Sequence, residues 1–280
     1  MVINSIQTLR KELQSKSNSA TIGLVPTMGY LHQGHLSLIQ KAKKRNDIVV
    51  VSIFVNPTQF GPGEDLDRYP RDLDRDVKIA YENGADYIFA PSAQEMYGPD
   101  YATYVNTEGT ITSKLCGKSR PFHFRGVTTV VTKLFNIVKP HDAYFGQKDA
   151  QQLSVIKRLV KDLNFDINII SCPIVRDQDG LALSSRNVYL SKAERKQALI
   201  LSQALNESKT LYLNGHTCAL ELKEHIINRV QSMDLAKIDY VEIVDFESLE
   251  DVTIVGKQTL IALAVYFGTS RLLDNIILEV

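Results

Sequence analysis

The sequence contains no tryptophan and only three cysteines among its 280 residues. Cys116, Cys172 and Cys218 lie far apart, without the close pairs of a zinc site or the density of a disulfide-stabilised domain. We therefore expect reduced cysteines that are mostly buried as small apolar side chains.

The chain also lacks net charge, because 32 lysines and arginines balance 32 aspartates and glutamates. Neither a nucleic acid nor a membrane surface is therefore an expected partner, and any anion must be bound by local geometry. The most apolar runs, residues 48–55 and 260–267, are far shorter than the roughly 20 residues that span a bilayer. Residues 1–19 lack the features of a signal peptide, so we expect a cytoplasmic protein.

The first part of the chain alternates short apolar runs, rich in β-branched residues, with helical patterns. Strands are expected at residues 21–25, 48–55, 87–90, 143–145 and 167–171. Helices are expected at residues 36–45, 73–82, 127–138 and 150–162. This alternation predicts parallel βαβ units in an α/β, doubly wound sheet.

The last hundred residues have a different order of elements. A turn at residues 177–180 is followed by helical patterns at 192–213 and 219–230, and then by strands near 240–244, 260–266 and 275–280. We predict a larger domain at residues 1–174 and a smaller α+β domain at residues 175–280, joined by a short hinge near residues 173–177. The functional site is expected in the cleft between them.

The first strand leads directly into a turn that carries two glycines and two histidines, residues 26–35. Such a turn at the carboxyl end of a sheet presents free N–H groups and a helix N-terminus to a phosphate. His32 and His35 could both donate hydrogen bonds to an α-phosphate as charge develops on it. Alternatively, one histidine only caps the turn; a zinc site is disfavoured because no third ligand has suitable spacing.

Asn56 and Gln59 follow the second strand, and they should therefore lie at the same sheet edge as the histidines. The Gln59 amide could hold the hydroxyl and carboxylate groups of a small substrate, whereas Asn56 could simply stabilise the turn. The acidic residues between 64 and 76 are expected mainly at the surface.

Two further polar segments complete the expected site. In residues 145–152, Lys148 could bridge phosphates while Asp149 caps the following helix and binds ribose or orients a magnesium shell. In residues 180–187, Ser184, Ser185 and Arg186 offer phosphate ligands near the hinge. Each segment alone is also compatible with an ordinary cap or surface loop.

The His-x-Gly-His core of residues 32–35 is similar to the nucleotide-binding turn of the nucleotidylyltransferase superfamily. Together with residues 54–61, 120–126, 145–152 and 183–187, in this order, the sequence resembles the pantothenate synthetase family from about Ser5 to the C-terminus. The resemblance implies a Rossmann-like domain that binds nucleotide and pantoate, with the second domain acting as a lid. It also implies a homodimer and ATP used with Mg²⁺.

The resemblance implies an ATP-dependent ligase that condenses (R)-pantoate with β-alanine through a pantoyl adenylate, releasing AMP and pyrophosphate. The implied catalytic residues are His35, usually assigned as proton donor, with His32, Lys148, Ser184, Ser185 and Arg186. The implied ATP-binding residues are Met28, Gly29, Tyr30, Leu31, His32, Gln33, Gly34, His35, Gly146, Gln147, Lys148, Asp149, Val175, Leu183, Ser184, Ser185 and Arg186. The implied residues for pantoate and β-alanine are Gln59, Gln152, Asn56 and Arg120.

The sequence departs from the family pattern at two positions. Gln147 stands where the family more often has glutamate, which removes a negative charge near the nucleotide. Leu183 stands where methionine is usual, and it keeps an apolar contact for adenine. The magnesium ligands are not identified. Two other functions share parts of this pattern: a nucleotidylyltransferase for another small substrate, and a non-catalytic nucleotide- or RNA-binding module.

Overall fold

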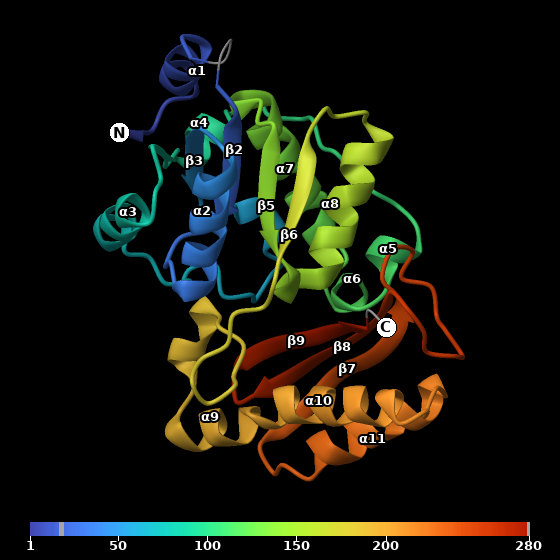
Figure 1. The fold of residues 1–280 in the computed structure, drawn as a ribbon. Helices are drawn as coiled ribbons and strands as arrows, with labels where there is room; N and C mark the ends of the chain where they lie inside the picture. The colour runs from blue at the N-terminus through green and yellow to red at the C-terminus, as the bar shows by residue number, and fades with distance from the viewer. Residues whose placement is uncertain (17–19, 279–280) are drawn as a thin grey trace.

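The computed structural model describes residues 1–16 and 20–278 of the chain. Two β-sheets lie one above the other in Figure 1, with the parallel sheet of the first half above and a smaller antiparallel sheet below. The predicted α/β fold with an α+β C-terminal part is therefore confirmed. The predicted division between residues 174 and 175 falls just after the last strand of the parallel sheet and stays a prediction.

The parallel sheet has six strands in the order β1-β4-β3-β2-β5-β6. The chain begins with β1 at the edge of the sheet, crosses to β2 in the middle and winds back through β3 to β4, which pairs with β1; it then places β5 and β6 on the other side of β2. The register pairs Ile22 with Ile48 and Gly23 with Asp142. Its strands are β1 (Val2–Ile3), β2 (Ile22–Thr27), β3 (Ile48–Ile53), β4 (Tyr87–Phe89), β5 (Asp142–Gly146) and β6 (Asn168–Cys172).

Alternate residues of the buried strands supply two separate cores, as expected for a sheet covered on both faces. Ile48 and Val50 pack with the first group of helices, whereas Val49 and Val51 pack with the second. The first group is α1 (Ile6–Gln14), α7 (His123–Val138) and α8 (Ala150–Asp162); the second is α2 (Gln33–Arg45) and α3 (Leu73–Glu82). The helices therefore lie on both faces of the sheet, as the alternation in the sequence predicts.

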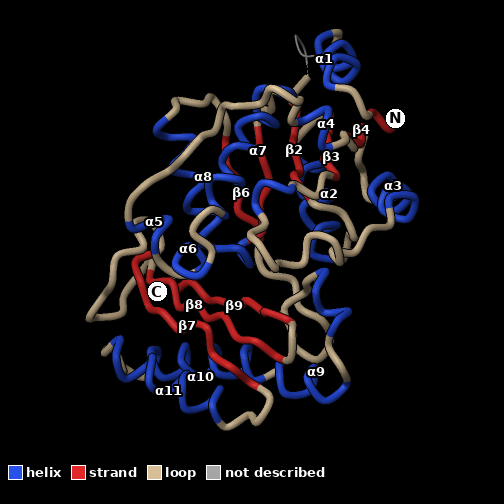
Figure 2. The backbone as a smooth tube through the Cα atoms, turned by 180° about the vertical axis from the view of Figure 1, so that it is seen from behind, coloured by secondary structure: helices blue, strands red, loops and turns tan. Residues whose placement is uncertain are grey.

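The C-terminal part is a three-stranded antiparallel sheet that lies between two helices and the parallel-sheet half (Figures 1 and 2). One face packs on the helices, while Val244, Leu260 and Ala262 join the core formed by α7 and α8. Its elements are α9 (Lys192–Ala198), α10 (Ile200–Leu213), α11 (Ala219–Gln231), β7 (Ala236–Asp245), β8 (Thr259–Phe267) and β9 (Ser270–Leu278). A continuous apolar contact thus connects the two halves.

Two predicted elements differ from the structure, and two observed elements were not expected. The helix expected at residues 192–213 is interrupted at Leu199, whose N–H bonds to the carbonyl of Gln197 instead of one a full turn earlier. The strand expected at 275–280 begins earlier, at Ser270. Arg271 and Asp274 interrupt the apolar pattern of its first half, so the sequence did not indicate a strand there. The expected residues 279–280 lie outside the described part of the chain. The elements β1 and α1 were not predicted.

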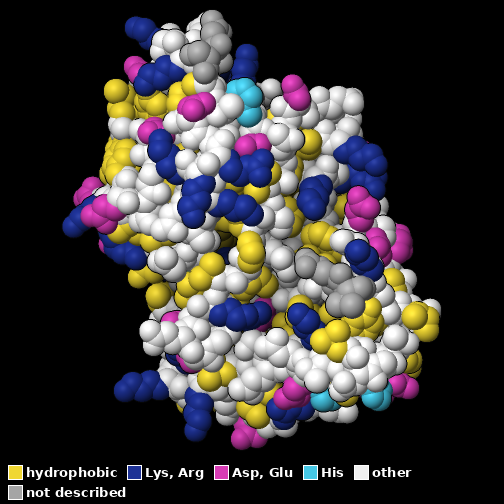
Figure 3. All heavy atoms as spheres, in the orientation of Figure 1, with side chains coloured by type: hydrophobic (Ala, Val, Ile, Leu, Met, Phe, Trp, Pro, Cys, Tyr) yellow, Lys and Arg dark blue, Asp and Glu magenta, His cyan; other side chains and the backbone are white. Residues whose placement is uncertain are grey.

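Short helical turns connect these elements, and several of them border the site. They are η1 (Pro57–Gln59), α4 (Ala93–Met96), α5 (Thr110–Ser113), α6 (Cys116–Ser119), η2 (Gln147–Asp149) and η3 (Ser185–Tyr189). Among the helices of residues 1–16 and 20–278, none combines the length and apolarity that crossing a bilayer requires. Figure 3 shows side chains of both charge signs scattered over one face, consistent with the zero net charge.

The cysteines follow the sequence-based expectation in part. Cys116 and Cys172 are buried and Cys218 is half-buried, and all three are free thiols. They are therefore packing residues in this fold, and no disulfide joins any pair of them.

Candidate active site

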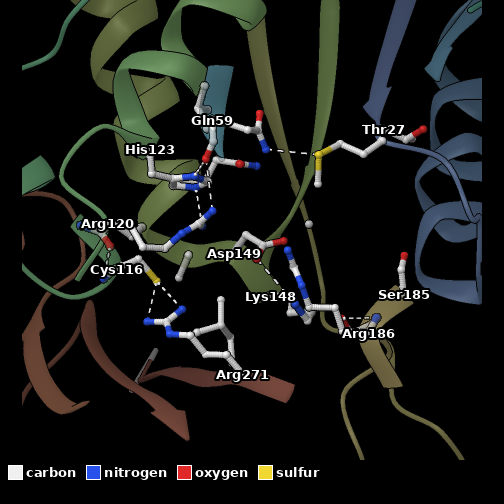
Figure 4. Close-up of a pocket in the computed structure, with 18 of the residues that line it drawn as sticks. Thr27, Gln59, Cys116, Arg120, His123, Lys148, Asp149, Ser185, Arg186 and Arg271 are labelled. Atoms are coloured by element: carbon white, nitrogen blue, oxygen red, sulfur yellow. Dashed lines mark hydrogen bonds and ion pairs between the residues drawn. The ribbon is translucent and has the colours of Figure 1, made fainter. Parts of the chain in front are cut away.

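A cavity of about 580 Å³ lies between the two sheets, at the carboxyl ends of the parallel strands. It is centred on the point where β2 is flanked by β3 on one side and β5 on the other, so that the chain winds away in opposite directions. Ligands of doubly wound folds bind at this switch point. Figure 4 shows polar side chains from the parallel-sheet turns and from β9 directed toward the same space.

His32 and His35 form a reciprocal cap at the start of α2. The N–H of Gly34 donates to His32 Nδ1 at 3.2 Å, and the N–H of His32 donates to His35 Nδ1 at 3.3 Å. Since both Nδ1 atoms accept, each neutral ring carries its proton on Nε2. A Cβ on Gly34 would lie 2.9 Å from the His32 ring, so glycine is required here. The two histidines can therefore cap the helix through Nδ1 and still present two Nε2–H donors on the cavity wall.

Both histidines are neutral at neutral pH. Burial, assisted by the charge of Lys148, lowers the pKa of His32 to about 4. Burial, the adjacent His32 and Lys148 lower the pKa of His35 well below its usual value. The pair therefore offers hydrogen bonds without positive charge.

Asp76 fixes the turn that precedes the histidines. Its carboxylate accepts the N–H groups of Tyr30 and Leu31 at 2.6 and 2.7 Å, and its side chain is only 1% exposed. Tyr30 has a φ of 51°, which this pair of bonds holds in place. The prediction that the acids of residues 64–76 lie mainly at the surface is therefore wrong for Asp76, because two backbone donors compensate its burial.

Only part of the predicted nucleotide turn reaches the cavity. Met28, His32, Gly34 and His35 line it. Gly29, Tyr30, Leu31 and Gln33 are not among the described residues that line it; they shape the turn behind the wall.

Gln59 lines the cavity beside Met28, and Asn56 holds it there. The Gln59 Nε2 donates to Met28 Sδ at 3.2 Å, and Gln59 Oε1 accepts from Asn56 Nδ2 at 3.1 Å. The second Asn56 Nδ2 proton is donated to the Gly126 carbonyl, while Asn56 Oδ1 accepts from Thr58 and Tyr97. The Asn56 amide is thus fully used within the protein, as its turn-stabilising alternative requires.

Gly126 brings the start of α7 against the turn that carries Gln59. A Cβ at this position would lie 2.5 Å from the Thr58 carbonyl oxygen and 2.6 Å from the Gln59 nitrogen. No side chain fits between these backbones, so helix and turn form one rigid unit.

Arg120 is already paired in this structure. Its guanidinium donates to Glu64, with Nε to Oε1 at 2.7 Å, and Nη2 also donates to the Gln59 carbonyl at 3.2 Å. The remaining group, Nη1, lies 3.2 Å from His123 Nε2. Although burial alone would raise it, the hydrogen bond and charge of Arg120 lower the pKa of Glu64.

His123 and Glu64 are site residues that the sequence analysis did not assign. His123 Nδ1 lies 2.9 Å from the Gln59 carbonyl, so it carries the proton and Nε2 accepts from Arg120. Burial, followed by Arg120, lowers the pKa of His123 to about 4. His123 belongs to the Arg-Pro-Phe-His string that carried the resemblance, and that string was its only signal.

Lys148, Asp149 and Gln152 line the cavity after β5, together with Gly146, whereas Gln147 is not among its described lining residues. The predicted cap was wrong in detail: Asp149 occupies the N-cap position of α8, but its side chain makes no cap hydrogen bond. Its Oδ1 instead lies 3.6 Å from Lys148 Nζ. Asn275 of β9 donates to the carbonyls of Gln147 and Lys148 at 3.1 and 2.9 Å.

The segment after the hinge forms the opposite side of the cavity. The Leu183 N–H donates to the Val175 carbonyl at 3.0 Å, which places both side chains on the cavity wall. The Ser185 hydroxyl donates to the Tyr30 carbonyl at 3.3 Å, and Ser184 Oγ accepts from the Arg186 N–H. Arg186 forms a bidentate ion pair with Asp65, with Nε donating to Oδ2 at 2.7 Å and Nη2 donating to Oδ1 at 2.9 Å.

No group of three or more histidine, cysteine, aspartate or glutamate side chains in residues 1–16 and 20–278 could hold a metal ion. Asp149, whose side chain is 47% exposed, is a carboxylate on the cavity wall. A cation in this cavity would therefore depend mostly on oxygen ligands from a bound molecule and water.

Comparison with known proteins agrees with this geometry. A family model described as pantoate-beta-alanine ligase matches residues 1–277. The pantothenate synthetases of Acetivibrio thermocellus and Thermotoga petrophila are 60% and 57% identical, covering 100% and 99% of this chain and 99% of each relative.

Solved structures give the same result. Pantothenate synthetase from Thermus thermophilus has a TM-score of 0.95 at 43% identity, covering 100% of this chain and 99% of the other. Pantoate-beta-alanine ligase from Francisella tularensis, complexed with beta-gamma ATP and beta-alanine, has a TM-score of 0.84 at 37% identity, covering 99% and 97%.

Proposed function

Because this chain belongs to the pantoate-beta-alanine ligase family, we propose that the cavity between its sheets condenses pantoate with β-alanine at the expense of ATP. The protein is an ATP-dependent ligase, and the proposed reaction releases AMP and pyrophosphate. The observation that carries the assignment of its residues is the neutral His32–His35 cap, with both Nε2–H donors at the switch point of the sheet.

In the first step, a carboxylate oxygen of pantoate attacks the α-phosphorus of ATP. The bond from that phosphorus to the bridging oxygen breaks, and pyrophosphate leaves with the electron pair. His32 and His35 donate hydrogen bonds to the phosphate oxygens, where charge develops, and Lys148 contributes a positive charge. Gln59 and Gln152 hold pantoate in line for the attack.

In the second step, the neutral amine of β-alanine attacks the acyl carbon of pantoyl adenylate. The new C–N bond replaces the C–O bond to phosphate, AMP leaves with the electron pair, and the nitrogen releases a proton to water. The adenylate is hydrolysed if water reaches it. The link of η3 to the opposite wall, from the Ser185 hydroxyl to the Tyr30 carbonyl, would keep the cavity closed during this step.

Arg186 and Arg120 must change partners if they are to bind substrate anions. Each guanidinium is paired with a carboxylate of the same loop, Asp65 or Glu64. We propose that the ATP phosphates take the place of Asp65 on Arg186, and that Arg120 reaches pantoate only through its contacts with Gln59 and His123.

Mg²⁺ would enter as part of the nucleotide substrate. The phosphates and water supply the oxygen ligands that this ion prefers, and Asp149 is the side chain that would contact its hydration shell. The bound ion supplies charge neutralisation on the phosphates.

A homodimer in the cytoplasm is the remaining part of the proposal. The exposed Tyr104 and Phe122, both stacked against Arg125, form an aromatic and cationic surface that a second copy could cover. Sedimentation equilibrium would test this. A monomer at micromolar concentration, or a dimer unchanged by Phe122→Ser, would contradict this surface.

The assigned reaction is tested by the products of ATP turnover. We expect pyrophosphate with pantoate alone, in amounts limited by the enzyme-bound adenylate, and AMP together with pantothenate when β-alanine is added. Turnover of CTP in place of ATP, or transfer of AMP to a phosphorylated acceptor, would instead support a nucleotidylyltransferase.

A further inference from the structure

Arg271 of β9 is a cation on the cavity wall to which neither the sequence nor the proposed reaction assigns a role. Its side chain is 14% exposed, and its guanidinium points into the cavity on the side of Cys116 and Arg120, away from Ser185 and Arg186 (Figure 4). The nucleotide side of the cavity thus contains Arg186 and Lys148, whereas Arg271 faces the side proposed for the acid and the amine.

The hydrogen bonds of Arg271 leave part of its guanidinium without an oxygen acceptor. Nε and Nη2 donate to one oxygen of Asp239, Oδ2, at 3.0 and 2.6 Å. Nη2 also lies 3.5 Å from Ser119 Oγ. Within the described residues, Nη1 has only the sulfur of Cys116, at 3.5 Å, and a thiol is a weak acceptor.

The other arginine on this side is more fully occupied. Arg120 directs its donors to both oxygens of Glu64, to the Gln59 carbonyl and to His123. Nη1 and Nη2 of Arg271 share the weak Cys116 Sγ acceptor, and the second N–H of Nη1 has no acceptor among the described residues. Arg271 therefore retains the better opening for a further anion, to which it can donate a charge-assisted hydrogen bond. The exposed hydroxyl of Ser119 and the hydroxyl of Tyr240, which lies 3.4 Å from Cys116 Sγ, border the same position.

The chemistry of the second substrate requires such a position. β-Alanine presents its amine to the acyl carbon, while its carboxylate extends two methylene groups away and keeps a full negative charge. An unpaired carboxylate in a cavity closed to water is costly. We propose that Arg271, with Ser119, forms the carboxylate subsite for the amine substrate, and that it selects short ω-amino acids over uncharged amines.

This inference rests on the proposed ligase reaction, so its test measures the two steps separately. Pantoate-dependent exchange of pyrophosphate into ATP reports the first step without any amine. The second step is measured with two amines. β-Alanine, which has the carboxylate, gives pantothenate, and β-alaninamide, which lacks it, gives pantothenamide.

We expect Arg271→Gln to retain pyrophosphate exchange within about 3-fold of the wild-type rate. Its KM for β-alanine should rise about 10- to 100-fold, which corresponds to the loss of a charge-assisted hydrogen bond. Its kcat/KM for β-alaninamide should stay nearly unchanged, so the preference for β-alanine over β-alaninamide is largely lost. A merely structural role would reduce both amines alike.

Arg271→Lys is the matched variant, because it keeps the charge and removes the Nη1 donor; an intermediate preference is expected. The subsite is overturned if Arg271→Gln keeps pyrophosphate exchange and its ratio of kcat/KM for β-alanine to kcat/KM for β-alaninamide equals that of the wild type. If Arg271→Gln loses exchange through misfolding, the ratio in Arg271→Lys decides in the same way. Absence of exchange in the wild-type protein would instead refute the proposed ligase reaction.

Discussion

The two walls of the cavity are built in different ways. The sheet wall consists of the turns after β2, β3 and β5, where Asp76 and Asn56 hold the backbone in place for His35 and Gln59. The cap wall consists of residues 183–186 and the strands β7, β8 and β9. Its Asp274 and Asn275 sit within a regular strand and mainly hold other parts of the protein.

The two walls therefore have different tasks: the sheet wall contacts the reacting groups, and the cap wall holds the parts of the site in position. The sheet wall presents neutral donors to the place where phosphate charge develops, at the carboxyl ends of strands that cannot move without unfolding the core. The cap wall connects three segments: Asp274 pairs with Arg176 at the hinge, and Asn275 holds the turn of Lys148. We therefore expect substitutions in the sheet wall to reduce rates, and substitutions in the cap wall to change affinities.

The largest effect should follow removal of the His35 imidazole. His35→Ala is expected to slow pyrophosphate exchange about 100- to 1,000-fold, because a donor to the developing charge is lost. His35→Asn separates the two functions of the ring, since its amide oxygen can still accept the His32 N–H but offers no group at the Nε2 position. Equal losses in both variants are expected; near wild-type exchange in either would refute the role of the Nε2–H.

Asp76 tests whether the sheet wall depends on its buried support. Asp76→Asn turns one oxygen acceptor into an N–H donor that faces a backbone N–H, so we expect a loss of about 2 to 3 kcal/mol in the free energy of unfolding. Urea denaturation measures this. Asp74→Asn is the control, because Asp74 lies in the same first turn of α3 but is exposed. Similar stabilities of the two variants would contradict the proposed support.

Asn275 tests the cap wall. Asn275→Ala removes the donors to the Gln147 and Lys148 carbonyls, and should raise the KM for ATP about 5- to 30-fold with a smaller change in kcat. Asn275→Asp should be worse, because an acceptor would then face two carbonyl oxygens. A fall in kcat at unchanged KM would show that this wall takes part in the chemistry, and the distinction between the walls would fail.

The last expected effect is a pH dependence of stability that originates in two buried histidines of the cavity, His32 and His123. The pKa values of His32 and His123 are about 4 in the folded protein, below the usual value of about 6.5. The unfolded chain therefore binds protons first, and the free energy of unfolding should decrease as the pH is lowered from about 6.5 toward 4.

The matched pair for this measurement is His123→Asn and His216→Asn. The first should reduce the pH slope, since it removes a buried ring while its amide can still donate to the Gln59 carbonyl. The second replaces an exposed histidine and should leave the slope as in the wild type. A slope insensitive to His123→Asn would contradict the proposed cause.

The sequence predicted the sheet wall well because its information is local. Each turn follows a strand whose apolar run is easily recognised, and parallel strands bring their carboxyl ends together. The predicted helices at residues 73–82 and 150–162 have the observed bounds. What the local pattern could not reveal is which acid turns inward: Asp76 lies among exposed charged neighbours, and only the fold places it under Tyr30.

The cap wall could not be predicted in the same way. Arg271, Asp274 and Asn275 lie in one strand, without a glycine turn or motif to mark them, and their partners are 32 to 155 residues away. Their polarity even obscured the start of β9. Pairings of this kind depend on how the antiparallel sheet packs against the first half of the chain, which residue patterns do not encode locally.

The contact at Gly126 has a consequence for redesign of the ligase toward other acids. Because backbone meets backbone between α7 and the Gln59 turn, the pocket cannot be enlarged by shifting either element. Room for a bulkier hydroxy acid would have to come from side chains that line the cavity and can be shortened, such as Met28 or Val131. Directed-evolution libraries should therefore vary those positions and leave the glycine fixed.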